Sequence, residues 1–113
     1  MYNSSNVSAK ESLTKDNTFI ENKLASKFTK KFCNSIAFGI SQESALRFTA
    51  GEDRKEASRK KYLENIDFED LENNIASSVV NTCGLPLGLS GQKGVAEFKL
   101  FLSESGELDY FKK

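Results

Sequence analysis

The sequence of 113 residues contains no histidine, no tryptophan, one proline and two cysteines. Without histidine, the chain lacks the commonest general base and the commonest metal ligand of proteins. The residues present do not form a recognisable pair of catalytic nucleophile and general base, so we expect no enzyme, no cofactor and no metal site. Strictly apolar runs reach only two or three residues, which is too short to span a membrane.

A net charge is also lacking, because 16 Lys and Arg balance 16 Asp and Glu. This balance argues against a dedicated binder of nucleic acid or of anionic membranes. It is uneven along the chain, however, since residues 19–61 sum to +5 and residues 62–113 sum to −5. If the fold keeps these halves on separate faces, complementary charged faces would orient a protein partner or a second copy of the chain.

The two cysteines, Cys33 and Cys83, form no CxxC motif. Small secreted domains held by disulfides usually contain four or more cysteines. The first residues also lack the basic and apolar regions of a signal peptide. We therefore expect buried, reduced thiols and a cytoplasmic protein, with peripheral attachment to a membrane complex left open.

The first 18 residues are poor in apolar side chains and rich in Ser, Asn, Thr and Lys. Such a segment buries too little surface to offset the entropy lost on ordering. We expect residues 1–18 to form a flexible, disordered N-terminal arm and residues 19–113 to form a single helical domain.

Apolar residues recur at helical spacing through most of that domain, which predicts an all-α fold, a small bundle of four or five helices. The first helix is expected over 19–38, after a capping box formed by Thr18 and Glu21. Ser41 caps a second helix that ends at Gly51, and a third follows over 52–66, its charged start in water. Another begins after Asp67 and ends at Gly84. The last is expected over 91–103, with Leu108, Tyr110 and Phe111 folding back on the core.

Residues 84–91 form a loop of Gly, Pro and Leu before the last helix. In an extended loop, Leu85, Leu87 and Leu89 would lie on one side. They either plug one end of the bundle or insert into a partner, because exposed apolar patches commonly mark interfaces.

A basic cluster precedes Tyr62 and is a second candidate partner-binding region; it consists of Arg54, Lys55, Arg59, Lys60 and Lys61. Acidic residues interleave with it, which is typical of a solvated helix face. The alternative is an RNA- or DNA-contacting helical protein that uses this cluster.

The start of the last helix is a candidate anion site. Ser90, Gly91 and Lys93 lie in a glycine-rich entry to a helix, where free backbone N–H groups can bind phosphate. The spacing of a phosphate-binding loop is absent, so a small phosphate-ligand sensor remains an alternative.

Together these features predict a non-enzymatic helical protein-interaction module, an accessory, regulatory or assembly protein of a larger complex.

Overall fold

The computed structural model describes residues 5–57 and 66–112, with side chains described over 19–55 and 66–112. The described residues form four α-helices and no strand, which confirms the all-α prediction. The helices are α1 (Ser5–Ala37), α2 (Gln42–Ala57), α3 (Phe68–Leu87) and α4 (Gly91–Ser105), and a short 3-10 helix, η2 (Asp109–Phe111), follows.

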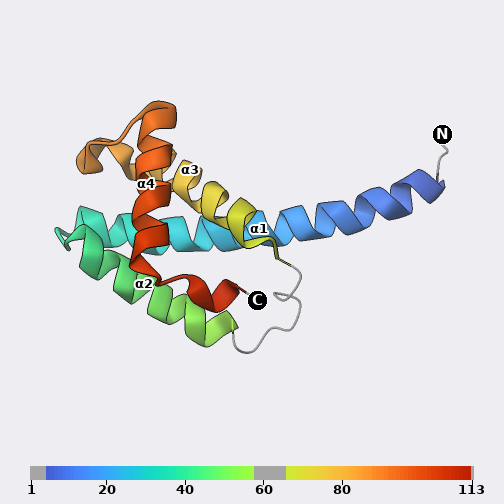
Figure 1. Cartoon of the computed structure of the whole chain (residues 1–113), viewed down its shortest axis with the longest axis horizontal. Helices are drawn as coiled ribbons and strands as arrows, with labels where there is room; N and C mark the ends of the chain where they lie inside the picture. Colours follow the sequence, from blue (N-terminus) through green and yellow to red (C-terminus); the bar gives the residue numbers. More distant parts are fainter. Residues whose placement is uncertain (1–4, 58–65, 113) are drawn as a thin grey trace.

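Helix α1 begins at Ser5, so the predicted start after Thr18 is wrong. Residues 5–18 contain neither proline nor glycine, and nothing in them obliges a helix to stop. The capping box of Thr18 and Glu21 therefore lies inside a continuous helix rather than at its start. The N-terminal part of α1 projects beyond the other helices (Figure 1).

Helix α2 passes through Gly51, so the predicted second and third helices are one element as far as Ala57. Gly51 does not adopt the left-handed conformation that ends a helix, and it is simply tolerated within one. Glu52, Arg54 and Lys55 after it are exposed, as predicted for a charged segment in water. Asp53 is the exception, because it is buried and its Oδ1 lies 3.4 Å from Lys31 Nζ on α1. The remainder of the predicted third helix, 58–65, lies outside the described residues.

Helix α3 is bent near its end. Cys83 leaves helical geometry (φ −137°, ψ 29°), one residue before the predicted stop at Gly84, and a further helical turn follows. Pro86 is accommodated because its missing N–H falls in the first turn after the bend, where a helix needs no donor. The turn ends at Gly88 (φ +73°), so the expected loop 84–91 is reduced to residues 88–90.

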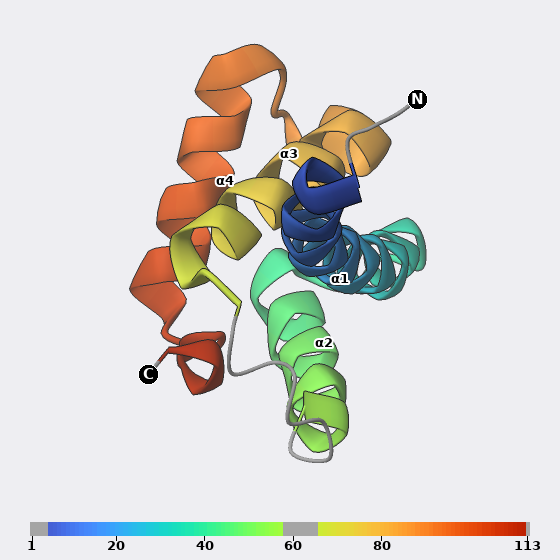
Figure 2. The same cartoon turned by 90° about the vertical axis from the view of Figure 1, so that its right-hand side faces the viewer.

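Helices α1 and α3 run parallel, side by side. Three links join them in the same order along both helices: Asn74 Nδ2 donates to Asn22 Oδ1 (2.7 Å), Thr29 Oγ1 donates to Ser78 Oγ (2.7 Å), and Cys33 is bonded to Cys83. Figure 2 shows α1 nearly end-on, with α2 and α4 on different sides of it.

The core is built on phenylalanine rings. The rings of Phe28 and Phe32 on α1 are stacked with centroids 5.8 Å apart, and Phe32 meets Phe98 of α4 edge to face at 5.2 Å. Leu108 and Phe111 are buried, so the tail folds back on this core as predicted.

The cysteines correct the expectation of reduced thiols. Cys33 and Cys83 form a disulfide, with their Cα atoms 5.7 Å apart. Both lie on the apolar faces where buried thiols were predicted, and the parallel packing of α1 and α3 brings them together. None of the described helices combines the length and the hydropathy that a membrane-spanning segment requires.

Candidate functional site

The turn between α1 and α2 exposes large apolar side chains. Gly39 (φ +88°) allows the chain to reverse, and its N–H donates to Ile36 O (2.9 Å) while the N–H of Ile40 donates to Ser35 O (3.0 Å). These bonds close the turn on the backbone alone. They leave Phe38 86% exposed and Ile40 43% exposed.

The last turn of α3 exposes a third such side chain, since Leu85 is 93% exposed. Leu87 and Leu89 are instead partly buried against the core. The prediction that the three leucines share one side is wrong, because residues 84–87 are helical and not extended. Of the three leucines, Leu87 and Leu89 thus pack partly against the core, and Leu85 alone has the exposure expected of a docking residue.

Phe38, Ile40 and Leu85 belong to the same end of the bundle, which we call the apolar end. Leu85 follows Cys83 by two positions and Phe38 follows Cys33 by five, and those cysteines are covalently joined. In Figure 1 the turn between α1 and α2 and the last turn of α3 both lie at the left-hand side. The disulfide therefore places the ends of α1 and α3, which carry or precede these three exposed side chains, at the same end of the bundle.

The exposed residues of the apolar end lie in segments without charge. Neither 32–42, which contains Phe38 and Ile40, nor 73–92, which contains Leu85, has Asp, Glu, Lys or Arg. The exposed neighbours are uncharged polar residues such as Asn81 and Thr82. Depletion of charge around aromatic and aliphatic side chains is typical of the buried centre of a protein–protein interface. Phe38 and Ile40 were missed from the sequence, and these charge-free segments are the signal that could have found them.

The described residues of the predicted basic cluster, Arg54 and Lys55, do not lie at the apolar end. Arg54 lies some 12 residues along α2 from its start, or about 18 Å. Its guanidinium is 3.5 Å from Glu107 Oε1 and 5.2 Å from the centre of the Tyr110 ring. Lys55 is exposed, and Arg59, Lys60 and Lys61 lie outside the described residues. Arg54 is thus engaged with the C-terminal tail, which leaves its charge less available to a phosphate.

The predicted anion site has the geometry of an ordinary helix start. Ser90 is the N-cap residue of α4, but its side chain makes no capping hydrogen bond. Gly91 and Lys93 follow in the first turn and are exposed. Gly94 is buried against Leu89, where an added Cβ would lie 3.0 Å from Leu89 C, so close packing accounts for this glycine.

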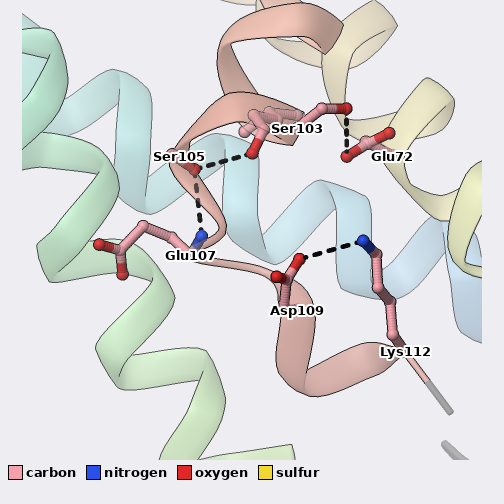
Figure 3. Close-up of polar contacts among 7 residues, drawn as sticks. Glu72, Ser103, Ser105, Glu107, Asp109 and Lys112 are labelled. Atoms are coloured by element: carbon pink, nitrogen blue, oxygen red, sulfur yellow. Dashed lines mark hydrogen bonds and ion pairs between the residues drawn. The ribbon is translucent and has the colours of Figure 1, made fainter.

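Two carboxylates at α3, those of Asp67 and Glu72, stabilise the fold. Asp67 Oδ1 accepts from Asp70 N (3.1 Å) and caps α3 as predicted. Glu72 is buried, and its Oε2 accepts from Ser103 Oγ on α4 at 3.0 Å (Figure 3). Figure 3 also shows Ser105 receiving the Glu107 N–H at the end of α4. Across the described residues, no three Cys, Asp or Glu side chains gather into a metal-binding group.

The core packing, capping and charge pairs of the fold thus do not account for the exposed side chains of the apolar end. No protein family, no curated protein and no solved structure matches the chain.

Proposed function

We propose that the protein is a non-enzymatic helical interaction module that docks another protein through its apolar end, in an accessory or assembly role. The observation that carries this proposal is the exposure of Phe38 and Leu85 at one uncharged end of the bundle. Single exposed apolar residues are common on protein surfaces, and Phe19, Phe48 and Leu100 are further examples. A group of them on two adjoining turns is the pattern of a binding surface.

The chemistry of the apolar end favours a protein partner. Nucleic acid and anionic lipid headgroups are bound by clustered Lys and Arg, which both segments of this end lack. A protein partner would supply apolar pockets for the phenyl ring and the leucine side chain. Steering by the charged halves of the chain is a separate prediction, and docking through an uncharged end does not depend on it.

The disulfide weakens the prediction of a cytoplasmic location. That prediction rested on the lack of signal-peptide features and on a cysteine content typical of reduced thiols, whereas disulfides persist mainly in oxidising compartments. The cellular compartment is therefore not part of the proposed function.

The test is capture of a partner from an extract of the native cells by the immobilised, oxidised chain. We expect a partner that is recovered by the unchanged chain and lost at least about tenfold with Phe38→Ser or Leu85→Ser, because each change removes a buried contact. Leu100→Ser, which alters an exposed leucine on α4, is the matched control and should retain the partner.

Salt provides the second criterion. Recovery should be similar at about 0.1 M and about 1 M salt, because charged pairs are screened at high salt and apolar contacts are not. A partner that all three variants retain, or one that high salt releases, would contradict docking through the apolar end.

A further inference from the structure

The disulfide occupies a particular place among the links between α1 and α3. The Asn22–Asn74 and Thr29–Ser78 hydrogen bonds lie along the bundle, and the Cys33–Cys83 bond is the last link before the apolar end. Beyond it, the described side chains of these two helices form no hydrogen bond or ion pair with each other. The relative position of the two exposed turns therefore depends on the disulfide and on apolar packing.

Cys83 is also the residue at which α3 bends. The turn that carries Leu85 begins directly after it and is closed on itself, since the N–H of Leu89 donates to Gly84 O (2.8 Å). The turn is thus held at its start by Cys83 and at its end by Leu87 and Leu89, which pack partly against the core. A bond that fixes Cys83 to α1 fixes the start of this turn, two residues before Leu85, with respect to α1.

We infer that the Cys33–Cys83 disulfide controls the apolar end, so that the docking surface is assembled in the oxidised chain and lost on reduction. This inference rests on the proposed function. A surface that depends on a few side chains binds well only when they are held in place beforehand, because ordering them on binding costs free energy. Displacement of one apolar anchor lowers affinity by roughly 10- to 100-fold.

The redox step is a thiol–disulfide exchange with a dithiol. The dithiol attacks the protein disulfide, becomes a cyclic disulfide, and passes two electrons and two protons to Cys33 and Cys83. Cys33 is only 9% exposed and Cys83 only 8% exposed. Burial therefore protects the bond while the apolar end is closed, and the reductant gains access when this end opens locally.

NMR relaxation of backbone amides tests the inference without a partner. In the oxidised chain, the amides of 36–42 and 84–91 should have order parameters of about 0.85. After reduction with dithiothreitol, the order parameters of these amides should fall below about 0.6. The amides of 26–31, around the Thr29–Ser78 hydrogen bond, should remain rigid. Reoxidation should restore the first values, and Cys33→Ser/Cys83→Ser should match the reduced chain.

Three results would overturn the inference. The first is that the amides of the apolar end keep their order parameters after reduction. The second is that the order parameters of 26–31 fall as much as those of the apolar end. The third is that both the reduced chain and the double variant lose helix content. The last would mean that the bond holds the whole fold and not its end.

The partner capture described above separates this inference from the proposed function. A partner that depends on Phe38 and is recovered equally by oxidised and reduced chains would refute redox control and leave docking intact. Failure of the oxidised chain to recover any such partner would refute docking, whatever the relaxation measurements show.

Discussion

Gly84 and Gly51 both lie inside helices, but only Gly84 is closely packed. A Cβ at Gly84 would collide with the carbonyl oxygen of Leu89 and lie 3.3 Å from Val80 Cγ1, whereas a Cβ at Gly51 meets nothing within 4 Å. We predict that Gly84→Ala lowers the free energy of unfolding by about 1–3 kcal/mol, the usual cost of overpacking. The backbone oxygen cannot move aside as a flexible side chain could.

Gly51→Ala is the matched control for that substitution. Alanine in the middle of α2 should raise the free energy of unfolding by about 0.5–1 kcal/mol, because glycine loses more backbone entropy in a helix. Urea denaturation of the oxidised chain measures both changes. Stabilisation by Gly84→Ala would show that the turn after the bend is looser than the structure indicates.

At the scale of the helices, α1 meets the N-terminal end of α3 at Glu21. The pKa of the Glu21 carboxyl is raised by burial and by the negative charges of Asp70 and Asp67, and a backbone hydrogen bond from Asp67 offsets part of this effect. The ionised carboxylate is therefore less favourable in the folded chain than in the unfolded chain. The penalty is absent below the ordinary glutamate pKa and is fully present once the pH exceeds the raised folded pKa.

We predict that Glu21→Gln stabilises the protein near pH 7 and has little effect near pH 4, since the neutral amide removes the penalty at the higher pH. The gain should be under about 1 kcal/mol, because Glu21 lines an open groove and water screens its charge. Urea midpoints at both pH values measure it, with Glu97→Gln on the exposed face of α4 as the control. An equal gain at both pH values would assign the effect to helix propensity instead of charge.

Helix ends were predictable where a local interaction fixes them. Ser41 accepts the Ser44 N–H at 3.2 Å, and Asp67 caps α3 in the same way, so both starts could be inferred from neighbouring residues. The same reasoning failed at Thr18 and Gly51, because these residue types permit an end without requiring one. At Thr18 no proline or glycine in the preceding residues stops the helix, and at Gly51 the helix continues to the buried Asp53.

The apolar end, by contrast, exists only at the scale of the whole molecule. Two charge-free segments, 32–42 and 73–92, can be found in the sequence, but only the parallel arrangement of α1 and α3 places them together. The disulfide was missed for the same reason, since the spacing of two cysteines does not reveal which helix faces meet. The opposite charges of the two halves are likewise partly joined within the molecule, as the Arg54–Glu107 pair shows.

The disulfide should also contribute much of the stability of the whole molecule, because it closes a loop across a sequence separation of 50. Cross-linking a loop of this length lowers the entropy of the unfolded chain, and the chain-entropy relation gives about 4 kcal/mol. That contribution is a large share of the roughly 5–15 kcal/mol by which a typical domain is stable. The reduced chain stays folded when the free energy of unfolding of the oxidised chain exceeds this contribution. We therefore predict that reduction lowers the free energy of unfolding by about 4 kcal/mol in urea titrations followed by far-UV circular dichroism. The variant Cys33→Ser/Cys83→Ser should have the same urea midpoint as the reduced chain.

The free energy of unfolding should also fall less steeply with urea concentration in the oxidised chain than in the reduced chain, because the cross-linked unfolded state exposes less surface. Equal midpoints for the oxidised and reduced chains would mean that the bond adds nothing to global stability.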